Sequence, residues 1–359
     1  MGLTSGAESS GTGPGIGPGA IPPTGDTRFG ATLSARMGVA WYRDGAWQPA
    51  SVQETGPLPI HPASHALHFA SSCFEGLKAY PSPGGGIHLF RLDAHVRRVQ
   101  RSAHSLLLPI PETEFLSRLI IDSVAANAAD MPAAPGSLYV RPVLFGSEPI
   151  IAAGSFPSAE ACLCVLVSPV GDYFSSGKPL RLLVDEEHAR SVERLGATKT
   201  GGNYAASLGL VTAAREEHRA DQILFCPSGE VGETNASSFV LIREGQILTR
   251  QLDTVILHSV TREALLIVAE ERGYSVGQRL FDVDEMLEWV RTGEAALAGT
   301  AAVLSGVGTL IARGAERAVG AETEHAGEIG PLTAELRTTL TDLQRGLSED
   351  TRGWLQPVA

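Results

Sequence analysis

A short segment of small residues surrounds one lysine, and it constrains the fold of this chain more than any other feature. Residues 197–208 read Ala-Thr-Lys-Thr-Gly-Gly-Asn-Tyr-Ala-Ala-Ser-Leu, so Lys199 stands just before the expected start of a helix. Lysines are scarce in this sequence. Because small, apolar surroundings solvate an ammonium poorly, such a lysine can act as a nucleophile or form a Schiff base. A surface lysine in a glycine-rich turn gives the same pattern, and spacing alone does not separate the two interpretations.

Further segments of the chain separate them. The lysine segment resembles the cofactor-lysine segment of the branched-chain aminotransferases, which are class IV, fold type IV pyridoxal-phosphate enzymes. Other segments match that family in the same order along the chain. They are residues 65–69, 73–80, 90–91 with Arg98, 137–142, 232–233, 260–262 and 299–302. The resemblance covers about residues 36 to 350 and implies the fold, the cofactor and the activity of that family.

Composition places the chain among ordinary globular proteins. Its 359 residues suffice for about two domains, and 43% of them are apolar while 19% are charged. The formal net charge of −12 argues against a nucleic-acid-binding surface and favours a cytoplasmic protein. No apolar run is long enough to span a membrane, and the first residues lack the features of a signal peptide. We therefore expect neither a nucleic acid nor a membrane as a partner.

The four cysteines are expected to be buried free thiols. Their spacing does not fit a zinc site, and two of them alternate within a strand-like run. We expect no metal in this protein.

The distribution of residue types predicts two folded domains behind a disordered tail. Residues 1–33 are rich in glycine, serine, threonine and proline and are expected to be disordered. Residues 34–170 are expected to form a small N-terminal domain, 171–180 a linker, and 181–359 a larger domain that holds the cofactor. The predicted fold class is α+β, with a smaller α/β first domain and a larger second domain whose β-rich core is surrounded by helices.

Local signals place the main elements. Asp44-Gly45 and the segment 81–86 predict two hairpins. Asp93 and Ser259 are the predicted N-caps of two helices, and the second helix is expected to stop at Gly273. Further helices are expected over 112–129, 283–292 and 331–346, and buried strands over 137–145, 161–167, 222–226 and 238–242.

The resemblance implies a residue for each part of a pyridoxal-phosphate site. Lys199 is implied to bind the cofactor covalently and then to move the α-proton of the substrate as general base and acid. Tyr204 is implied to hydrogen-bond the phenolic oxygen of the cofactor, and Glu233 to keep its pyridine nitrogen protonated. From the residues alone, Glu230 is an equally good candidate, and either acid could simply be solvated near a turn.

The resemblance implies that the cofactor phosphate is held by Arg98 and by the start of the helix expected at Val260. Arg98 matches the family's arginine, although Arg97 and Arg101 lie beside it and a solvated basic face gives the same spacing. Val260 and Thr261 open the predicted capped helix, where free backbone amides and the helix dipole favour an anion.

The implied substrate residues are Phe74, Tyr139, Arg141, Thr300 and Ala301. Tyr139 and Arg141 match the side that receives the substrate carboxylate. Thr300 belongs to a turn that meets both the carboxylate and the cofactor phosphate in this family. Aromatic residues and an arginine of this kind also occur in cores without any substrate.

The sequence departs from the family pattern at three places. Ser237-Ser238 replaces a usual Asn-Leu, His258-Ser259 replaces a usual Pro-Gly, and Phe69 stands where a tyrosine is usual. These changes leave the preferred substrate side chain open.

The predicted function is pyridoxal-phosphate-dependent transamination of branched-chain or related apolar L-amino acids with 2-oxoglutarate, in a cytoplasmic homodimer. Within the same fold, the alternatives are a D-amino acid or (R)-amine transaminase and an aminodeoxychorismate lyase. A non-catalytic homologue is a third class.

Overall fold

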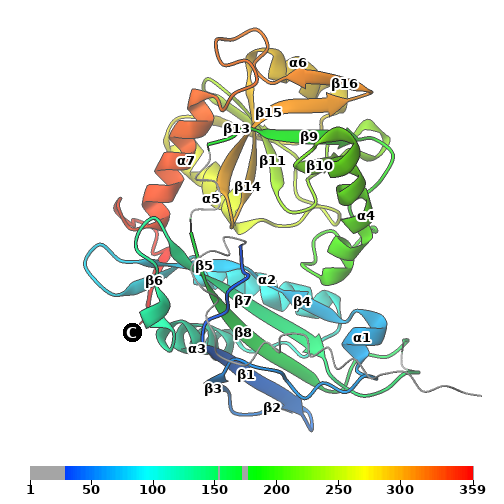
Figure 1. The fold of residues 1–359 in the computed structure, drawn as a ribbon, viewed down its shortest axis with the longest axis vertical. Helices are drawn as coiled ribbons and strands as arrows, with labels where there is room; N and C mark the ends of the chain where they lie inside the picture. Colours follow the sequence, from blue (N-terminus) through cyan, green and yellow to red (C-terminus); the bar gives the residue numbers. More distant parts are fainter. Residues whose placement is uncertain (1–28, 153, 172–176, 359) are drawn as a thin grey trace, which may run out of the picture.

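The computed structural model describes residues 29–152, 154–171 and 177–358, and these residues form two β-sheets with helices packed on them (Figure 1). Residues 1–28, most of the predicted tail, and residues 172–176 of the predicted linker lie outside the described residues. Among the helices that the structure describes, none is long and apolar enough to cross a membrane.

The first sheet pairs its strands antiparallel, in the order β17-β6-β5-β7-β8-β1-β2, with β3 on β1 and β4 on β7. Its strands are β1 (Arg36–Arg43), β2 (Ala46–Trp47), β3 (Ser51–Glu54), β4 (Ser72–Phe74), β5 (Leu77–Pro81), β6 (Ile87–Phe90), β7 (Ser137–Gly146), β8 (Ala161–Val170) and β17 (Leu355–Val358). The neighbouring helices are α1 (His65–Phe69), α2 (Leu92–Ser105), α3 (Thr113–Ala125) and a 3-10 turn, Ala128–Asp130.

Helices α2 and α3 pack on this sheet because their apolar residues recur at helical spacing. Val96 and Val99 of α2 are buried, as are Leu116 and Ile120 of α3. They share one core with the strand residues Leu77, Leu89, Leu138, Val140 and Leu163.

The second sheet is mixed and follows the order β10-β9-β15-β14-β11-β12-β13, with β16 on β15. Its strands are β9 (Leu180–Asp185), β10 (Gln222–Phe225), β11 (Ser238–Arg243), β12 (Gln246–Thr249), β13 (Ser275–Gln278), β14 (Glu294–Gly299), β15 (Val303–Ala312) and β16 (Ala315–Ala318). Its helices are α4 (Gly201–His218), α5 (Val260–Glu271), α6 (Val283–Thr292), α7 (Pro331–Gln344) and a 3-10 turn, Pro227–Gly229.

Strand β11 shows why this sheet is apolar on both faces. Phe239 and Leu241 share a core with residues of α6, whereas Val240 and Ile242 pack with residues of α5 and α7. Because side chains alternate between the faces of a strand, burial on both sides requires a continuous apolar run. The second sheet therefore lies between two layers of helices.

Most predicted elements are confirmed, and one predicted cap is wrong. The Asp44-Gly45 hairpin forms between β1 and β2, with positive φ at both turn residues. Ser259 caps α5 as predicted. Asp93 is not an N-cap, because α2 begins at Leu92 behind Arg91, whose backbone is left-handed and whose N–H donates to the Trp354 carbonyl at 2.6 Å.

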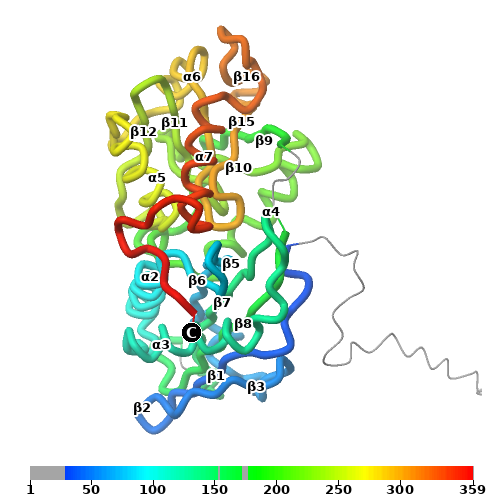
Figure 2. Tube along the Cα trace, turned by 90° about the vertical axis from the view of Figure 1, so that its left-hand side faces the viewer, coloured from blue at the N-terminus to red at the C-terminus, as the bar shows by residue number. Residues whose placement is uncertain are grey.

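The predicted α+β organisation is confirmed, while the domain boundaries stay a prediction. Strand β17 pairs with β6, so the last strand of the chain lies in the first sheet, although 181–359 were all predicted to lie in the second domain. Figure 2 shows this end of the chain running from α7 back to the first sheet.

Candidate active site

The segment that carries Lys199 is fixed against the first sheet. The Lys199 N–H donates to Ser102 Oγ on α2 at 3.1 Å, and its carbonyl accepts from the Phe74 N–H at 3.0 Å. Thr200 Oγ1 donates to the Ser72 carbonyl at 2.7 Å. Contacts to α2 and β4 therefore fix the backbone of Lys199 directly before α4 begins.

The amine of Lys199 lies between two aromatic side chains. Nζ donates to the Tyr204 hydroxyl at 2.9 Å and lies 4.9 Å from the centre of the Phe74 ring. Tyr204 is in the first turn of α4, and its ring centre is 5.2 Å from that of Phe74. A half-buried amine with these contacts does not fit a solvated surface turn.

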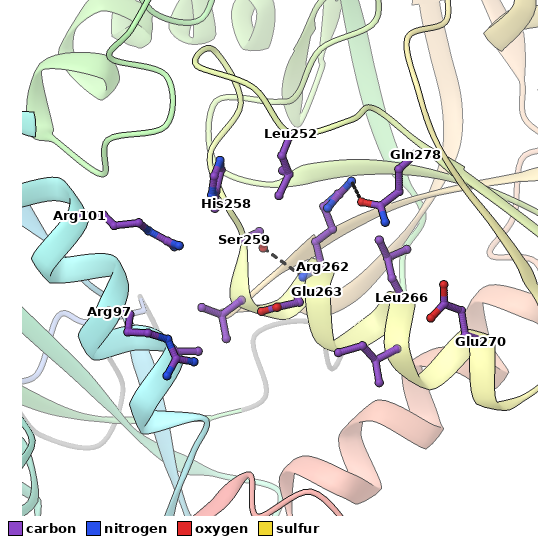
Figure 3. A pocket seen from close by; sticks show the side chains of 13 residues that line it. Arg97, Arg101, Leu252, His258, Ser259, Arg262, Glu263, Leu266, Glu270 and Gln278 are labelled. Carbon is purple, nitrogen blue, oxygen red and sulfur yellow. Dashed lines mark hydrogen bonds between the residues drawn. The ribbon is translucent and has the colours of Figure 1, made fainter. Parts of the chain in front are cut away.

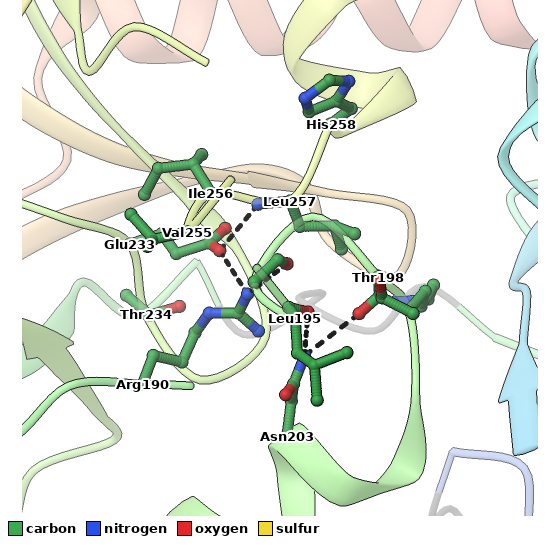
Figure 4. Close-up of polar contacts among 12 residues, drawn as sticks. Arg190, Leu195, Thr198, Asn203, Glu233, Thr234, Val255, Ile256, Leu257 and His258 are labelled. Atoms are coloured by element: carbon green, nitrogen blue, oxygen red, sulfur yellow. Dashed lines mark hydrogen bonds and ion pairs between the residues drawn. The ribbon is translucent and has the colours of Figure 1, made fainter. Parts of the chain in front are cut away.

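A buried carboxylate, Glu233, lies in the same region (Figure 4). Its Oε1 accepts from Arg190 Nη2 at 2.7 Å and from the Leu257 N–H at 2.9 Å. Burial raises the pKa of Glu233, and the nearby charge of Arg190 offsets this only in part. Glu230, the alternative acid, is 42% exposed and forms an ion pair with Arg250.

Arg98 is held by a second buried carboxylate, Glu75. Arg98 Nε donates to Glu75 Oε2 at 2.7 Å, and Nη2 donates to Oε1. Glu75 also accepts from the Gly76 N–H and from His95 Nδ1, each at 2.9 Å. Burial alone would raise the pKa of Glu75, but the positive charge of Arg98 and the contact with His95 hold it far below its usual range. The remaining nitrogen, Arg98 Nη1, donates to the His258 carbonyl at 3.1 Å.

That carbonyl directly precedes α5. The Ser259 side chain accepts from the Arg262 N–H at 3.2 Å and so caps the helix. Val260 and Thr261 are the first two residues of α5, and amides in a first turn lack partners within their own helix. The departure from Pro-Gly at 258–259 therefore preserves a helix start beside Arg98.

Most of the predicted cofactor residues lie around one narrow cavity. Arg98, Lys199, Tyr204, Glu233 and Thr300 line it. Val260 and Thr261 follow Ser259, which also lines it, while Glu230 does not belong to it. Ser237 and Ser238 line the cavity too, so one departure from the family lies in the site itself. Phe69 instead lies on α1, with its ring centre 4.9 Å from that of His65.

The predicted substrate residues form a neighbouring group. The Arg141 guanidinium carbon lies 4.7 Å from the centre of the Phe74 ring, and Nη2 donates to the Tyr139 hydroxyl at 2.7 Å. A Cβ on Gly76 would lie 2.0 Å from the same hydroxyl, so this position requires glycine. The Ala301 carbonyl accepts from Lys78 Nζ at 2.9 Å, and Lys78 is the β5 partner of Tyr139.

Comparisons with known proteins identify the family. The sequence model of Amino-transferase class IV matches residues 72–307. The chain is 36% identical to the branched-chain-amino-acid aminotransferase of Mycobacterium tuberculosis, over 91% of each chain. It is 34% identical to a probable branched-chain-amino-acid aminotransferase of Streptomyces coelicolor, over 89% of each. The chain is a class IV aminotransferase of the branched-chain family.

Solved structures agree with this assignment. The T.th. branched-chain amino acid aminotransferase with pyridoxamine 5'-phosphate superposes with a TM-score of 0.73 at 26% identity, covering 89% of this chain and 98% of that one. The enzyme of Thermobaculum terrenum in its PLP form gives a TM-score of 0.74 at 22% identity, covering 91% and 99%, and supports the fold. The predicted fold type IV is confirmed.

The groups that line the cavity of this aminotransferase suit the parts of pyridoxal phosphate. Among the described residues, Asn235 Oδ1, Ser238 Oγ and Arg190 Nε are buried without a hydrogen-bond partner, and all three residues line the cavity. Unpaired buried polar atoms in a cavity indicate that a ligand or water belongs there. A cationic side chain beside a helix start suits a phosphate, and the carboxylate of Glu233 suits a pyridine nitrogen.

Two residues of this aminotransferase site were not predicted. Glu75 lies in the short connection between β4 and β5, inside the matched segment 73–80, where its acid was an available signal. Arg190 stands nine positions before Lys199 in a segment without periodicity, and nothing in the sequence pointed to it.

Proposed function

We propose that this aminotransferase exchanges the amino group between branched-chain or related apolar L-amino acids and 2-oxoglutarate. One observation carries the proposal: the hydrogen bond between Lys199 Nζ and Tyr204 lies in a cavity that also contains Glu233 and Arg98. The relatives named above support the choice of branched-chain substrates.

Lys199 and Tyr204 form the reactive end of the proposed site. When bound, pyridoxal phosphate supplies an electron sink for the charge that forms at the substrate Cα. Lys199 would hold the cofactor covalently, and its free amine would take the proton from Cα and return it as general base and acid. Tyr204, 2.9 Å from Nζ, orients the amine and donates to the phenolic oxygen.

Glu233 faces the pyridine nitrogen in this proposal. Its carboxylate holds a proton at that nitrogen and so keeps the ring able to accept charge. Arg190 and the Leu257 N–H fix the carboxylate at 2.7 Å and 2.9 Å, which limits its rotation. Preorganised groups of this kind avoid reorganisation during the reaction.

The phosphate is held from two sides. Arg98 offers the second N–H of Nη1, because the first donates to the His258 carbonyl and Glu75 binds the other two nitrogens. Val260 and Thr261 offer the amides of the α5 start, and Thr300 lines the same cavity.

Arg141 receives the substrate carboxylate together with Tyr139. Among the described residues Arg141 forms no ion pair, and its buried Nε lacks a partner. An arginine in this state favours an incoming carboxylate. Phe74, Thr300 and Ala301 form the rest of the proposed substrate wall.

A substrate panel tests this function. The purified enzyme is assayed with L- and D-forms of leucine, isoleucine, valine and alanine, and with an (R)-amine, each with 2-oxoglutarate. We expect the L-branched amino acids to be preferred. Preference for a D-amino acid or an (R)-amine would replace the proposal with one of the alternatives above.

Borohydride reduction tests which lysine binds the cofactor, independently of which substrate the enzyme prefers. The sequence contains three lysines, Lys78, Lys178 and Lys199. Peptide mapping after reduction should place the cofactor on Lys199, and a label on either other lysine would contradict the site.

We also propose that the enzyme is a homodimer. Leu67 and Phe69 of α1 and the nearby Ile151 and Phe156 are large apolar residues that are 37% to 71% exposed. His65 Nε2 contacts the Phe156 carbonyl at 3.0 Å, so α1 and this loop form one surface. Exposed apolar surfaces of this kind favour protein contacts. Sedimentation at assay concentration should give twice the chain mass, and an active monomer would refute the proposal.

A cytoplasmic location completes the proposal. All four cysteines are buried and free, which suits a reducing compartment. Cell fractionation followed by an activity assay tests it, and activity confined to a membrane or secreted fraction would refute it.

A further inference from the structure

A second cleft lies between α2 and α5, and the one lining residue that it shares with the cavity of Lys199 is Ser259. Its volume is about 340 Å³, which is within the range of small-molecule sites. Figure 3 shows Arg97 and Arg101 of α2 facing the start of α5 across this cleft. Leu252, Leu266 and Ile267 provide its apolar walls.

Two arginines of the cleft form no ion pair with a carboxylate of the described residues. Among the described residues, Arg101 forms no ion pair. Arg262 is buried and donates only to neutral oxygens: Thr249 Oγ1 at 3.3 Å, the Arg250 carbonyl at 2.7 Å and Gln278 Oε1 at 3.0 Å. A positive cleft in a chain with a net charge of −12 is a specific feature of this surface.

The acidic groups nearby are largely engaged elsewhere. Glu263 pairs with Arg91 at 2.9 Å, and Arg97 pairs with Asp93 at 2.6 Å. Glu270 also lines the cleft and is the remaining carboxylate of its wall. The balance around Arg101 and Arg262 therefore stays positive.

The pKa values of Arg101, His258 and Arg262 are all lowered, as expected where positive groups lie together without a paired anion. Burial and the neighbouring charge of Arg98 lower the pKa of Arg101. Burial and then Arg101 lower the pKa of His258, and burial lowers the pKa of Arg262 to about 10. An anion in the cleft would oppose each of these shifts.

We propose that this cleft binds a small aliphatic anion, with its carboxylate or phosphate group between Arg101 and Arg262 and its chain against Leu252, Leu266 and Ile267. The charged group satisfies the two guanidiniums, and the chain covers the apolar wall. This site is distinct from the proposed substrate site at Arg141.

The cleft is also linked to the proposed phosphate site. Arg98 follows Arg97 on α2, and its bond to the His258 carbonyl joins α2 to the start of α5. An anion that bridges the same two helices stabilises this joint, so it should slow the loss of cofactor. This second effect rests on the proposed function, whereas binding of the anion does not. Linkage requires the cofactor and the anion to favour each other by the same factor.

The experiment is a calorimetric titration of the holoenzyme with hexanoate and with hexyl phosphate, and with hexan-1-ol as the neutral analogue. We expect hexanoate, hexyl phosphate or both to bind, depending on which charged group fits between the arginines. Hexan-1-ol should not bind. Arg101→Gln should weaken the anion at least roughly tenfold, about 1.4 kcal/mol. The matched control is Arg317→Gln, because Arg317 is exposed on β16 and forms no ion pair within the described chain.

Two further variants keep the result interpretable. Arg141→Gln should leave anion binding in the cleft intact, and Arg101→Lys should retain much of it, because the positive charge remains. The pKa of His258, followed by NMR, should rise when the anion is added. Binding that is unchanged in Arg101→Gln, or lost only in Arg141→Gln, would overturn the site. A rate of cofactor loss that hexanoate does not alter would overturn the coupling alone.

Discussion

Glu75 and Glu233 are both buried and both contact an arginine, yet their pKa values shift in opposite directions. Glu75 receives two nitrogens of Arg98, together with His95 and a backbone N–H. Glu233 receives one nitrogen of Arg190 and one backbone N–H, and otherwise faces the cavity. The number of donors, and not burial, decides between a carboxylate fixed in its charged form and one that can hold a proton.

The two environments suit two different roles. A permanently charged Glu75 can fix the position of Arg98. A carboxylate with a raised pKa, as at Glu233, can share a proton with a ligand inside the cavity. This contrast makes Glu75 a positioning residue in our proposal and Glu233 a cofactor-binding residue.

The largest effect is expected for Glu233→Gln, which removes the carboxylate that is proposed to hold the proton at the pyridine nitrogen. The cofactor should still bind, but turnover should fall by roughly a thousandfold, because losing about 4 kcal/mol of transition-state stabilisation changes the rate by that factor. Steady-state kinetics and the absorbance of the bound cofactor measure the two separately. Glu230→Gln is the control and should be mild, since Glu230 pairs with Arg250 outside the cavity. A severe Glu230→Gln with a mild Glu233→Gln would reverse the assignment.

Glu75→Gln should act on cofactor affinity more than on the chemical step. Losing the charged hydrogen bonds that orient Arg98 should cost about 1.5–3 kcal/mol, or roughly tenfold to a hundredfold in Kd. Equilibrium dialysis with pyridoxal phosphate and with pyridoxal checks this, because only the phosphorylated form should lose affinity. Glu263→Gln is the matched control: it breaks the pair with Arg91, where the Glu263 side chain is 57% exposed, and should cost less than about 1 kcal/mol. Equal losses for both ligands would mean that Glu75 has only a structural role.

Stability should depend on pH with opposite signs at the two positions. The folded-state pKa of Glu75 lies below its ordinary value of 4.5, so its contribution is present above that pH and is lost as the pH falls. The folded-state pKa of Glu233 is raised, so its contribution is present below 4.5 and is lost as the pH rises through the folded pKa. The free energy of unfolding can be measured with urea from about pH 3 to about pH 8. The stability of wild type relative to Glu75→Gln should decrease as the pH falls. Its stability relative to Glu233→Gln should decrease as the pH rises. If the unfolding free energies of the two variants depended on pH in the same way, Glu75 and Glu233 would not differ as proposed.

The smallest effect is expected for His95→Gln. His95 donates to Glu75 at 2.9 Å, but burial lowers its pKa, so the bond comes from a neutral ring. Its loss should cost about 1 kcal/mol of unfolding free energy and change the cofactor Kd by less than roughly tenfold. Thermal unfolding and the same dialysis measure it. A loss as large as that of Glu75→Gln would show that both donors are needed to keep Glu75 charged.

Elements with an unbroken local pattern were predictable from the sequence. Helix α6 has the predicted bounds, Val283–Thr292, because an apolar stripe and an acidic first turn mark it. The start of α2 was not predictable, since Arg91 adopts its left-handed backbone beside Trp354, more than 250 residues away. Local signals cannot report such a contact.

In the candidate site too, some residues were predictable from the sequence and others depend on contacts between distant segments. Lys199, Tyr204, Glu233 and Arg98 were predicted through a resemblance, and they lie around one cavity. Their partners Arg190 and Glu75 were missed, because each acquires its role only through a tertiary contact. The roles of all these residues stay predictions until the variants are measured.

Strand β17 has a consequence for the order in which the protein can be made. Its partner β6 leaves the ribosome about 265 residues earlier, since Leu355 pairs with Phe90. At roughly 5–20 residues per second, this edge of the first sheet waits on the order of 13–50 seconds for its last strand. During that interval β6 exposes unpaired backbone groups to neighbouring nascent chains. Truncation at the C-terminus should therefore expose β6, a strand made early in synthesis, as an unpaired edge of the first sheet.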